Sequence, residues 1–105
     1  MKKWTSPNPI EETTLLTQAK YRSVLDFGVA KVAPGDRLPK EGYTSHEGHE
    51  YSFILSGELS GESGGEAFHI KAGELSYIPL GEEHYCQNDG EEEVEIFFVM
   101  VSEEE

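Results

Sequence analysis

Two histidines and two glutamates occur together in residues 46–50, which read HEGHE. Residues of the same parity share a face of a β-strand, so His46 and Glu50 are expected to point the same way. His84, farther along the chain, could supply a second imidazole. Two imidazoles and one carboxylate that leave coordination positions open form the arrangement of non-haem Fe(II) oxygenases. The spacing therefore predicts a metal site, and the alternative is that these are exposed or hydrogen-bonded polar residues of strands.

The remaining two of the four histidines are weaker candidates. His49 has the opposite parity to His46 and Glu50, so it is expected to face away from the site unless a bend at Gly48 turns it inward. It could instead be a surface or interface histidine. His69 lies in a separate strand-like stretch and is interpreted as structural.

Cys86 and Asn88 share the parity of His84, so all three side chains are expected to face the same interior. Cys86 could be a redox-sensitive group beside a metal, or a small buried hydrophobe, which is the commoner role. No paired base marks it as a nucleophile. Both residues are therefore candidate accessory residues of the site.

The composition excludes several classes of function. The 105 residues are expected to form one domain with one core, and the formal net charge is −13, from 21 acidic and 8 basic residues. Such a chain lacks the basic patch that nucleic acids and anionic membranes require. The single cysteine excludes an intrachain disulfide, and the sequence contains neither a signal peptide nor a long apolar run. A cytoplasmic protein is expected.

Short β-favouring segments separated by turn signals run through the chain, and no long stretch has a 3.6-residue apolar period. This pattern predicts an all-β single domain, and a small jelly roll protects its sheet edges well at this size. The expected organisation is an N-terminal arm over residues 1–13, a β-barrel domain over 14–102 and an acidic tail over 103–105. A β pattern is expected from Tyr21 through Val32, and strands are expected at 51–55, 67–71, 75–78, 84–88 and 94–101, with the next strand or turn beginning at 58–61. An ambiguous element at 13–20, a loop at 36–43 and a Gly/Ser hairpin connection at 60–66 complete the expected pattern.

Two motifs in this sequence resemble those of the cupin superfamily. The second cupin motif, G-x5-P-x-G-x2-H-x3-N, is matched at every defined position between Gly73 and Asn88. The first, G-x5-H-x-H-x3-E-x6-G, is matched in its second half, from His46 through Glu50 to Gly57. The resemblance implies the cupin double-stranded β-helix, a jelly-roll barrel of the RmlC-like type, with a divalent metal at one mouth and a small organic ligand beside it.

The sequence departs from the first motif in two places. Thr44 stands where the family has its first histidine, and Leu38 stands where it has the leading glycine. The resemblance therefore carries over three of the four usual ligands, His46, Glu50 and His84, and implies Fe, Mn, Ni or Zn. Thr44 is expected on the same face, where it could hydrogen-bond a metal-bound water.

Three functions are compatible with this reading. The first is a metal-dependent enzyme, such as a dioxygenase or an isomerase. The second is a non-catalytic ligand-binding or sensor cupin, and the third is a degenerate cupin without metal.

Small cupins are often dimers, and a homodimer is expected because the first and last strands are apolar on both faces. Four aromatic residues are candidates for the lining of a pocket, namely Tyr43, Phe53, Tyr77 and Phe98.

Overall fold

The structure of the protein is a computed structural model that describes residues 1–5 and 23–103. The described chain consists of strands and connections without a helix, which confirms the all-β prediction. The strands are β1 (Lys2–Thr5), β2 (Val24–Val32), β3 (Arg37–Leu38), β4 (His49–Ser56), β5 (Glu58–Ser63), β6 (Glu66–Lys71), β7 (Glu74–Ile78), β8 (His84–Gln87) and β9 (Val94–Val101).

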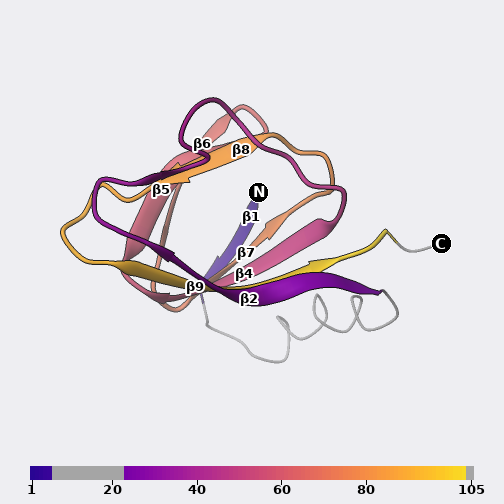
Figure 1. Ribbon diagram of the computed structural model, residues 1–105, viewed down its shortest axis with the longest axis horizontal. Coiled ribbons are helices and arrows are strands. Elements are labelled where there is room, and N and C mark those ends of the chain that lie inside the picture. Colours follow the sequence, from indigo (N-terminus) through magenta and orange to yellow (C-terminus); the bar gives the residue numbers. More distant parts are fainter. Residues whose placement is uncertain (6–22, 104–105) are drawn as a thin grey trace.

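Two antiparallel sheets face each other and curve around the centre of the molecule (Figure 1). One sheet has five strands in the order β1-β7-β4-β9-β2, and the other has four in the order β3-β8-β5-β6. Strand β9 pairs with both β2 and β4, so residues distant in sequence become neighbours in the larger sheet. This two-sheet, antiparallel arrangement is the predicted jelly roll.

The five-stranded sheet presents a different set of residues on each face. Alternate residues of β9, such as Ile96 and Phe98, point inward and line a cavity, as Glu50 and Ile54 of β4 do. Phe97 has the opposite parity and remains 40% exposed. The apolar character of β9 therefore reflects an inner face that fills the barrel and an outer face that is partly open in the single chain.

The connection expected at 60–66 is shorter than predicted. Strand β5 continues to Ser63 and β6 begins at Glu66, so the turn consists of Gly64 and Gly65 alone. Both glycines have positive φ, 61° and 82°, which suits a two-residue hairpin turn. Gly61, which looked like part of a loop, is a strand residue, and a Cβ there would lie 2.0 Å from the backbone oxygen of Tyr85. Its glycine allows two strand backbones to approach closely.

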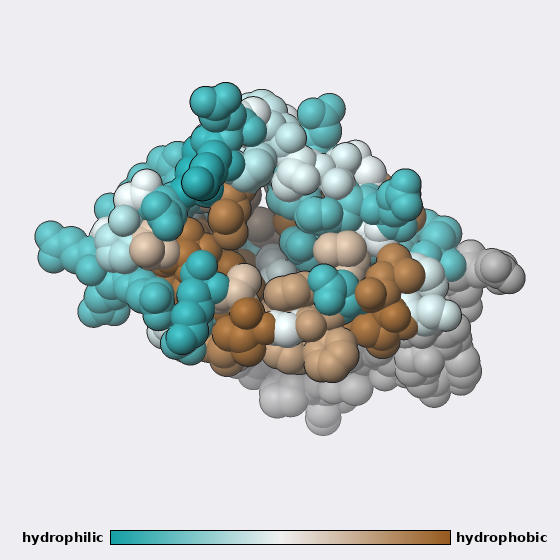
Figure 2. Space-filling model, in the orientation of Figure 1, coloured by the Kyte–Doolittle hydropathy of each residue, from teal (hydrophilic) through white to brown (hydrophobic). Residues whose placement is uncertain are grey.

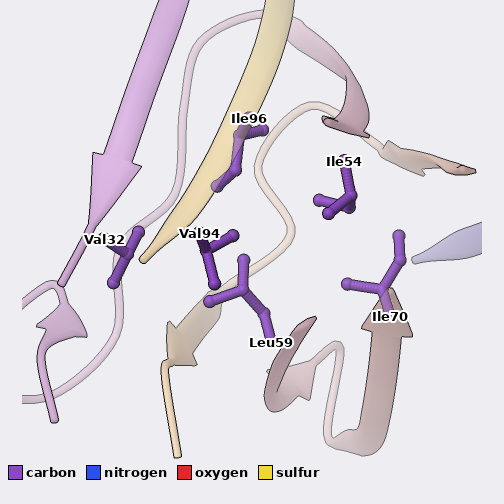
Figure 3. Packing of buried hydrophobic residues seen from close by; sticks show 6 residues of the cluster. All are labelled: Val32, Ile54, Leu59, Ile70, Val94 and Ile96. Carbon is purple, nitrogen blue, oxygen red and sulfur yellow. The ribbon is translucent and has the colours of Figure 1, made fainter. Parts of the chain in front are cut away.

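A cluster of buried aliphatic side chains holds the two sheets together (Figure 3). Val32, Ile54 and Val94 are at most 2% exposed, and they pack with residues from the opposite sheet. Burial of these side chains between the sheets contributes hydrophobic stabilisation to the barrel. The six members of the cluster are Val32, Ile54, Leu59, Ile70, Val94 and Ile96.

The two ends of the described chain are attached to the barrel. The first part of the predicted arm is strand β1, which pairs with β7 at the edge of the larger sheet. The carboxylate of Glu103, in the predicted acidic tail, lies 2.9 Å from Nε2 of His49. The ambiguous element at 13–20 and the rest of the arm lie outside the described residues. Over residues 1–5 and 23–103, the structure contains no helix long and apolar enough to cross a membrane.

Candidate metal centre

The structure brings together the three side chains that the sequence predicted as metal ligands. One potential ligand atom from each of His46, Glu50 and His84 lies within 4.8 Å of the other two. Nε2 of His46 is 3.6 Å from Oε1 of Glu50, and the two imidazole ring centres are 5.1 Å apart. These spacings suit three donors around one ion, since ligand distances of about 2.0–2.2 Å place neighbouring donors roughly 3–4 Å apart.

Each ligand candidate is positioned by a different part of the barrel. Glu50 lies on β4, where it is opposite Ile78 on one side and Met100 on the other. His84 begins β8 in the smaller sheet. His46 lies in the segment that leads into β4, and its carbonyl oxygen accepts a hydrogen bond from Gly81 N at 3.0 Å. The site is thus assembled from both sheets and one anchored connection.

The hydrogen bond of His84 fixes which ring nitrogen is free. Nδ1 of His84 is 2.9 Å from the carbonyl oxygen of Glu82. A carbonyl can only accept, so Nδ1 carries a proton, and in the neutral imidazole Nε2 is then the nitrogen with the lone pair. A hydrogen bond from the second ring nitrogen to a backbone carbonyl is the usual way in which a metal-ligating histidine is oriented. His84 is therefore prepared to act as a ligand through Nε2.

Thr44 occupies the place next to His84. The two residues form an antiparallel bridge, with Thr44 N donating to His84 O at 2.9 Å and His84 N donating to Thr44 O at 2.8 Å. Thr44 also lines the cavity into which the site opens. Its side chain thus stands on the predicted face, beside the ligand cluster.

A carboxylate beside the site is paired with the chain's N-terminal amine. Oε2 of Glu82 accepts hydrogen bonds from the Met1 ammonium group, at 2.5 Å, and from Ser63 Oγ, at 2.6 Å. Burial raises the pKa of Glu82, but these hydrogen bonds and the charge of the amine outweigh it and hold the pKa below its usual value. The pair fixes the start of β1 at the mouth of the barrel.

The ligand cluster faces a cavity of about 400 Å³ inside the barrel. Figure 2 shows it as a hollow in this face of the molecule, with hydrophobic residues along one side of it. Four members of the aliphatic cluster line its depth, and the rings of Phe68 and Phe98 add aromatic wall. Polar lining comes from Ser52, Ser76 and Tyr85, among others. A polar centre on apolar walls is the usual character of a small-molecule site.

Cys86 lies on the cavity as expected from its parity. Burial, and then the negative charge of Glu50, raises the pKa of the Cys86 thiol to about 11. The thiol is therefore protonated at neutral pH and does not have the thiolate character of a nucleophile. This agrees with its interpretation as a small apolar wall residue.

His49 and Asn88 lie elsewhere. His49 faces away from the cluster, as its parity predicted: Nδ1 is 2.8 Å from the hydroxyl of Tyr77, and the two rings stack. The expectation that Asn88 shares the interior of the site is wrong. Asn88 lies just beyond the end of β8, and its amide donates to the carbonyls of Val32, at 3.0 Å, and Glu92, at 2.7 Å. It fastens the connection before β9 instead.

Of the four aromatic candidates for a pocket lining, Phe98 is on the cavity. Tyr77 stacks on the ring of Tyr51 outside it, and Tyr43 is 50% exposed with its hydroxyl directed to Glu62. The wall residues that sequence reasoning missed include Phe68 and Ile70 of β6. The parity of β6 could have identified this pair, since alternate residues of that strand face the core.

The chain belongs to the cupin family, as its two motifs indicated. The sequence model of the cupin domain matches residues 28–100, which include all three ligand candidates. Among curated proteins, the chain is 31% identical over 94 residues to an oxalate-binding protein of Thermotoga maritima, covering 88% of this chain and 75% of that one. It is 30% identical over 86 residues to the polyketide synthase CurC of Streptomyces cyaneus. That match covers 81% of this chain and 54% of the Streptomyces protein, so this chain spans about half the length of that relative.

Solved structures agree with this assignment. The fold matches the crystal structure of a predicted oxalate decarboxylase from Thermotoga maritima with a TM-score of 0.68 and 27% identity, over 87% of this chain and 74% of that one. A cupin protein from Bacteroides fragilis matches with a TM-score of 0.64 and 19% identity, over 77% and 75% of the two chains, and shows the likeness of fold. Both comparisons confirm the cupin jelly roll.

Proposed function

We propose that this protein holds one divalent transition-metal ion through His46, Glu50 and His84 and binds a small organic ligand to the coordination positions that remain open. The observation that carries the proposal is the convergence of three donors at the apolar cavity, with His84 already oriented by the Glu82 carbonyl. Two imidazoles and a carboxylate suit Fe(II), Mn(II), Ni(II) or Zn(II). Its similarity to an oxalate-binding protein supports small-molecule binding by this chain.

The chemistry of the site follows from this donor set. A bound ion would act as a Lewis acid toward an oxygen atom of the ligand, or would bind dioxygen if it were Fe(II), as in an oxygenase. The chain itself would contribute orientation of the ligand, through the cavity walls, and a hydroxyl from Thr44 near the open positions. These features would serve an oxygenase or an isomerase, and the same site without turnover would serve as a ligand-binding module.

Metal analysis of matched histidine variants tests the proposal. The wild-type protein, His46→Ala and His69→Ala would be dialysed separately against Zn(II), Mn(II), Ni(II) and, without oxygen, Fe(II), and the bound metal would be counted by elemental analysis. His69 is a fair control because it is a half-exposed histidine that bonds Glu58 and Ser60 on β5. We expect near-stoichiometric metal in the wild type and His69→Ala, and a large loss in His46→Ala. An absence of metal from the wild type in all four cases would refute the site.

We also propose that the protein forms a homodimer through the outer face of β2 and β9. Leu25, Phe27 and Val29 are 53%, 66% and 55% exposed, and Phe97 of β9 extends the same apolar face. Chains with a net charge of −13 repel one another, so a contact between two copies is favoured where the surface is uncharged. A two-fold axis would place this face against its own copy.

Light scattering after size-exclusion chromatography measures the oligomeric state directly. We expect the wild type to elute as a dimer and Phe27→Glu as a monomer, because the variant buries a carboxylate in the apolar contact. Leu80→Glu is the control, since Leu80 is 39% exposed in the connection between β7 and β8. A monomeric wild type, or an unchanged dimer in Phe27→Glu, would exclude this interface.

A further inference from the structure

The charges around the cavity are unusual for a site that takes a small dianion. Two carboxylates, Asp26 and Glu50, line the cavity, and within residues 1–5 and 23–103 no lysine or arginine side chain does. Proteins that bind oxalate-sized dianions need positive groups directed at the ligand, because a buried charge without a partner is costly. In the described chain, a bound metal ion would have to supply that positive charge.

The cationic groups near the cavity are already engaged. Met1 lines the cavity, but its ammonium group is paired with Glu82. Arg37 lies with its guanidinium carbon 4.0 Å from the centre of the Tyr85 ring and donates to the carbonyl oxygen of Pro39 at 2.9 Å. Both are thus committed to other partners, and neither is directed at the ligand cluster.

A charge balance at the site then limits the ligand. A divalent ion held by Glu50 and two neutral imidazoles has a net charge of +1. A chelating group with one negative charge brings the assembly to neutrality, whereas oxalate, with two, leaves −1 among apolar walls in a cavity that Asp26 also lines. An apolar environment disfavours the second arrangement.

The size and walls of the cavity point to the same class of ligand. Its volume is about 400 Å³, within the range of roughly 300–1,000 Å³ of pockets for drug-sized molecules, and far more than two carboxylate groups occupy. The space beyond the ligand cluster is walled by Ile54, Ile70, Phe68 and Phe98. Apolar surface of a ligand would be removed from water there, which is favourable in proportion to its area.

We infer that this site takes an oxygen-chelating group with at most one negative charge, joined to an apolar or aromatic body, in preference to oxalate. The ligand would place its oxygen atoms toward His46, Glu50 and His84 and its body against the aliphatic and aromatic walls. This inference rests on the proposed metal site and adds to it the class of molecule that the cavity selects. The ligand expected for this chain therefore differs from the oxalate for which its relative is named.

Three probes separate charge from apolar contact. Acetohydroxamate and benzohydroxamate present the same chelating group with at most one charge and differ by a methyl against a phenyl body, and oxalate is the small dianion. Each would be titrated calorimetrically into zinc-loaded protein, with zinc retention checked by elemental analysis. We expect benzohydroxamate to bind about 10- to 100-fold more tightly than acetohydroxamate, from the apolar area that the phenyl group buries. We expect oxalate to bind more weakly than benzohydroxamate.

A matched pair of arginine variants tests the charge argument within one ligand. Leu38 lines the cavity and is 44% exposed, whereas Leu55 is 46% exposed and is not among the lining residues. We expect Leu38→Arg to tighten oxalate binding about 10-fold, because it adds a cation at the mouth of the cavity. Leu55→Arg should leave oxalate binding unchanged. A Phe98→Ala variant should reduce the advantage of benzohydroxamate over acetohydroxamate.

The outcomes distinguish this inference from the proposal on which it depends. If the protein binds no zinc, both fail. If it binds zinc but takes oxalate as tightly as benzohydroxamate, or binds the two hydroxamates equally, the inference on the ligand fails and the metal site stands. If Leu38→Arg does not change oxalate affinity, or Leu55→Arg changes it equally, the charge argument is overturned.

Discussion

Replacement of Glu50 by glutamine isolates the carboxylate as a ligand while keeping its shape. The Glu50 side chain is 18% exposed and lies 3.6 Å from His46. Loss of its charge should change the free energy of unfolding of the metal-free protein by about 1 kcal/mol or less. Metal affinity should fall far more: mutation of groups that only support metal ligands costs about 10–100-fold, and a direct ligand should cost about 100-fold or more.

The effect can be followed by thermal unfolding with and without metal. At a metal concentration of about 100 times the wild-type dissociation constant, binding stabilises the wild type by about 2.7 kcal/mol, and a 100-fold weaker variant by about 0.4 kcal/mol. For a domain of this size, these values correspond to increases in Tm of about 10–20 °C and about 2–3 °C. Differential scanning fluorimetry resolves the two easily.

Glu47 provides the matched control, because it lies in the same short segment and is exposed. We expect Glu47→Gln to keep the full metal-induced increase in Tm. The reasoning would be refuted if Glu50→Gln kept that increase while remaining folded, or if Glu47→Gln lost it to the same extent. Circular dichroism of both metal-free variants would show that the fold is intact.

Three further substitutions test the structure at other points. Gly61→Ala should prevent folding or lower the free energy of unfolding by more than about 4 kcal/mol, because the new Cβ would lie 2.0 Å from the Tyr85 carbonyl oxygen. Chemical denaturation measures this change, and a decrease below about 1 kcal/mol would contradict the close approach. Asn88→Ala should lower the free energy of unfolding by about 2–4 kcal/mol, since the buried Val32 carbonyl, the Glu92 carbonyl and the Gly90 amide all lose the Asn88 side chain as partner. A neutral effect would show that water replaces it. Thr44→His should tighten metal binding about 10-fold or more, because it adds a fourth donor beside His84. Metal binding would be measured by equilibrium dialysis, and equal or weaker binding than in the wild type would contradict the placement of Thr44.

The sequence was most informative where one physical rule decided the outcome. Strand parity placed Glu50 toward the interior and His49 away from it, and the two motifs related His84 to His46 and Glu50. Parity failed for Asn88, because the strand ends at Gln87 and the next residue no longer follows the strand's alternation. A residue at such a boundary is placed by the turn that follows, which the spacing of polar residues does not reveal.

Other features depend on contacts between segments distant in sequence. The glycine-rich composition of residues 60–66 indicated a loop, but Gly61 pairs with both Phe68 and Cys86 in the middle of a sheet. Its role appears only when the neighbouring strand is in place. The pairing of β1 with β7 and the contributions of β6 to the cavity also arise from the tertiary arrangement. Local propensity does not carry this information.

The origin of the ligand cluster in both sheets has a kinetic consequence. Glu50 belongs to one sheet and His84 to the other, so the complete set of donors exists only after the two sheets have docked. If docking completes after the folding transition state, metal would bind only on the native side of the barrier. It would then slow unfolding in proportion to its affinity and leave the rate of folding unchanged. Such an ion would lengthen the lifetime of the folded barrel without guiding its formation.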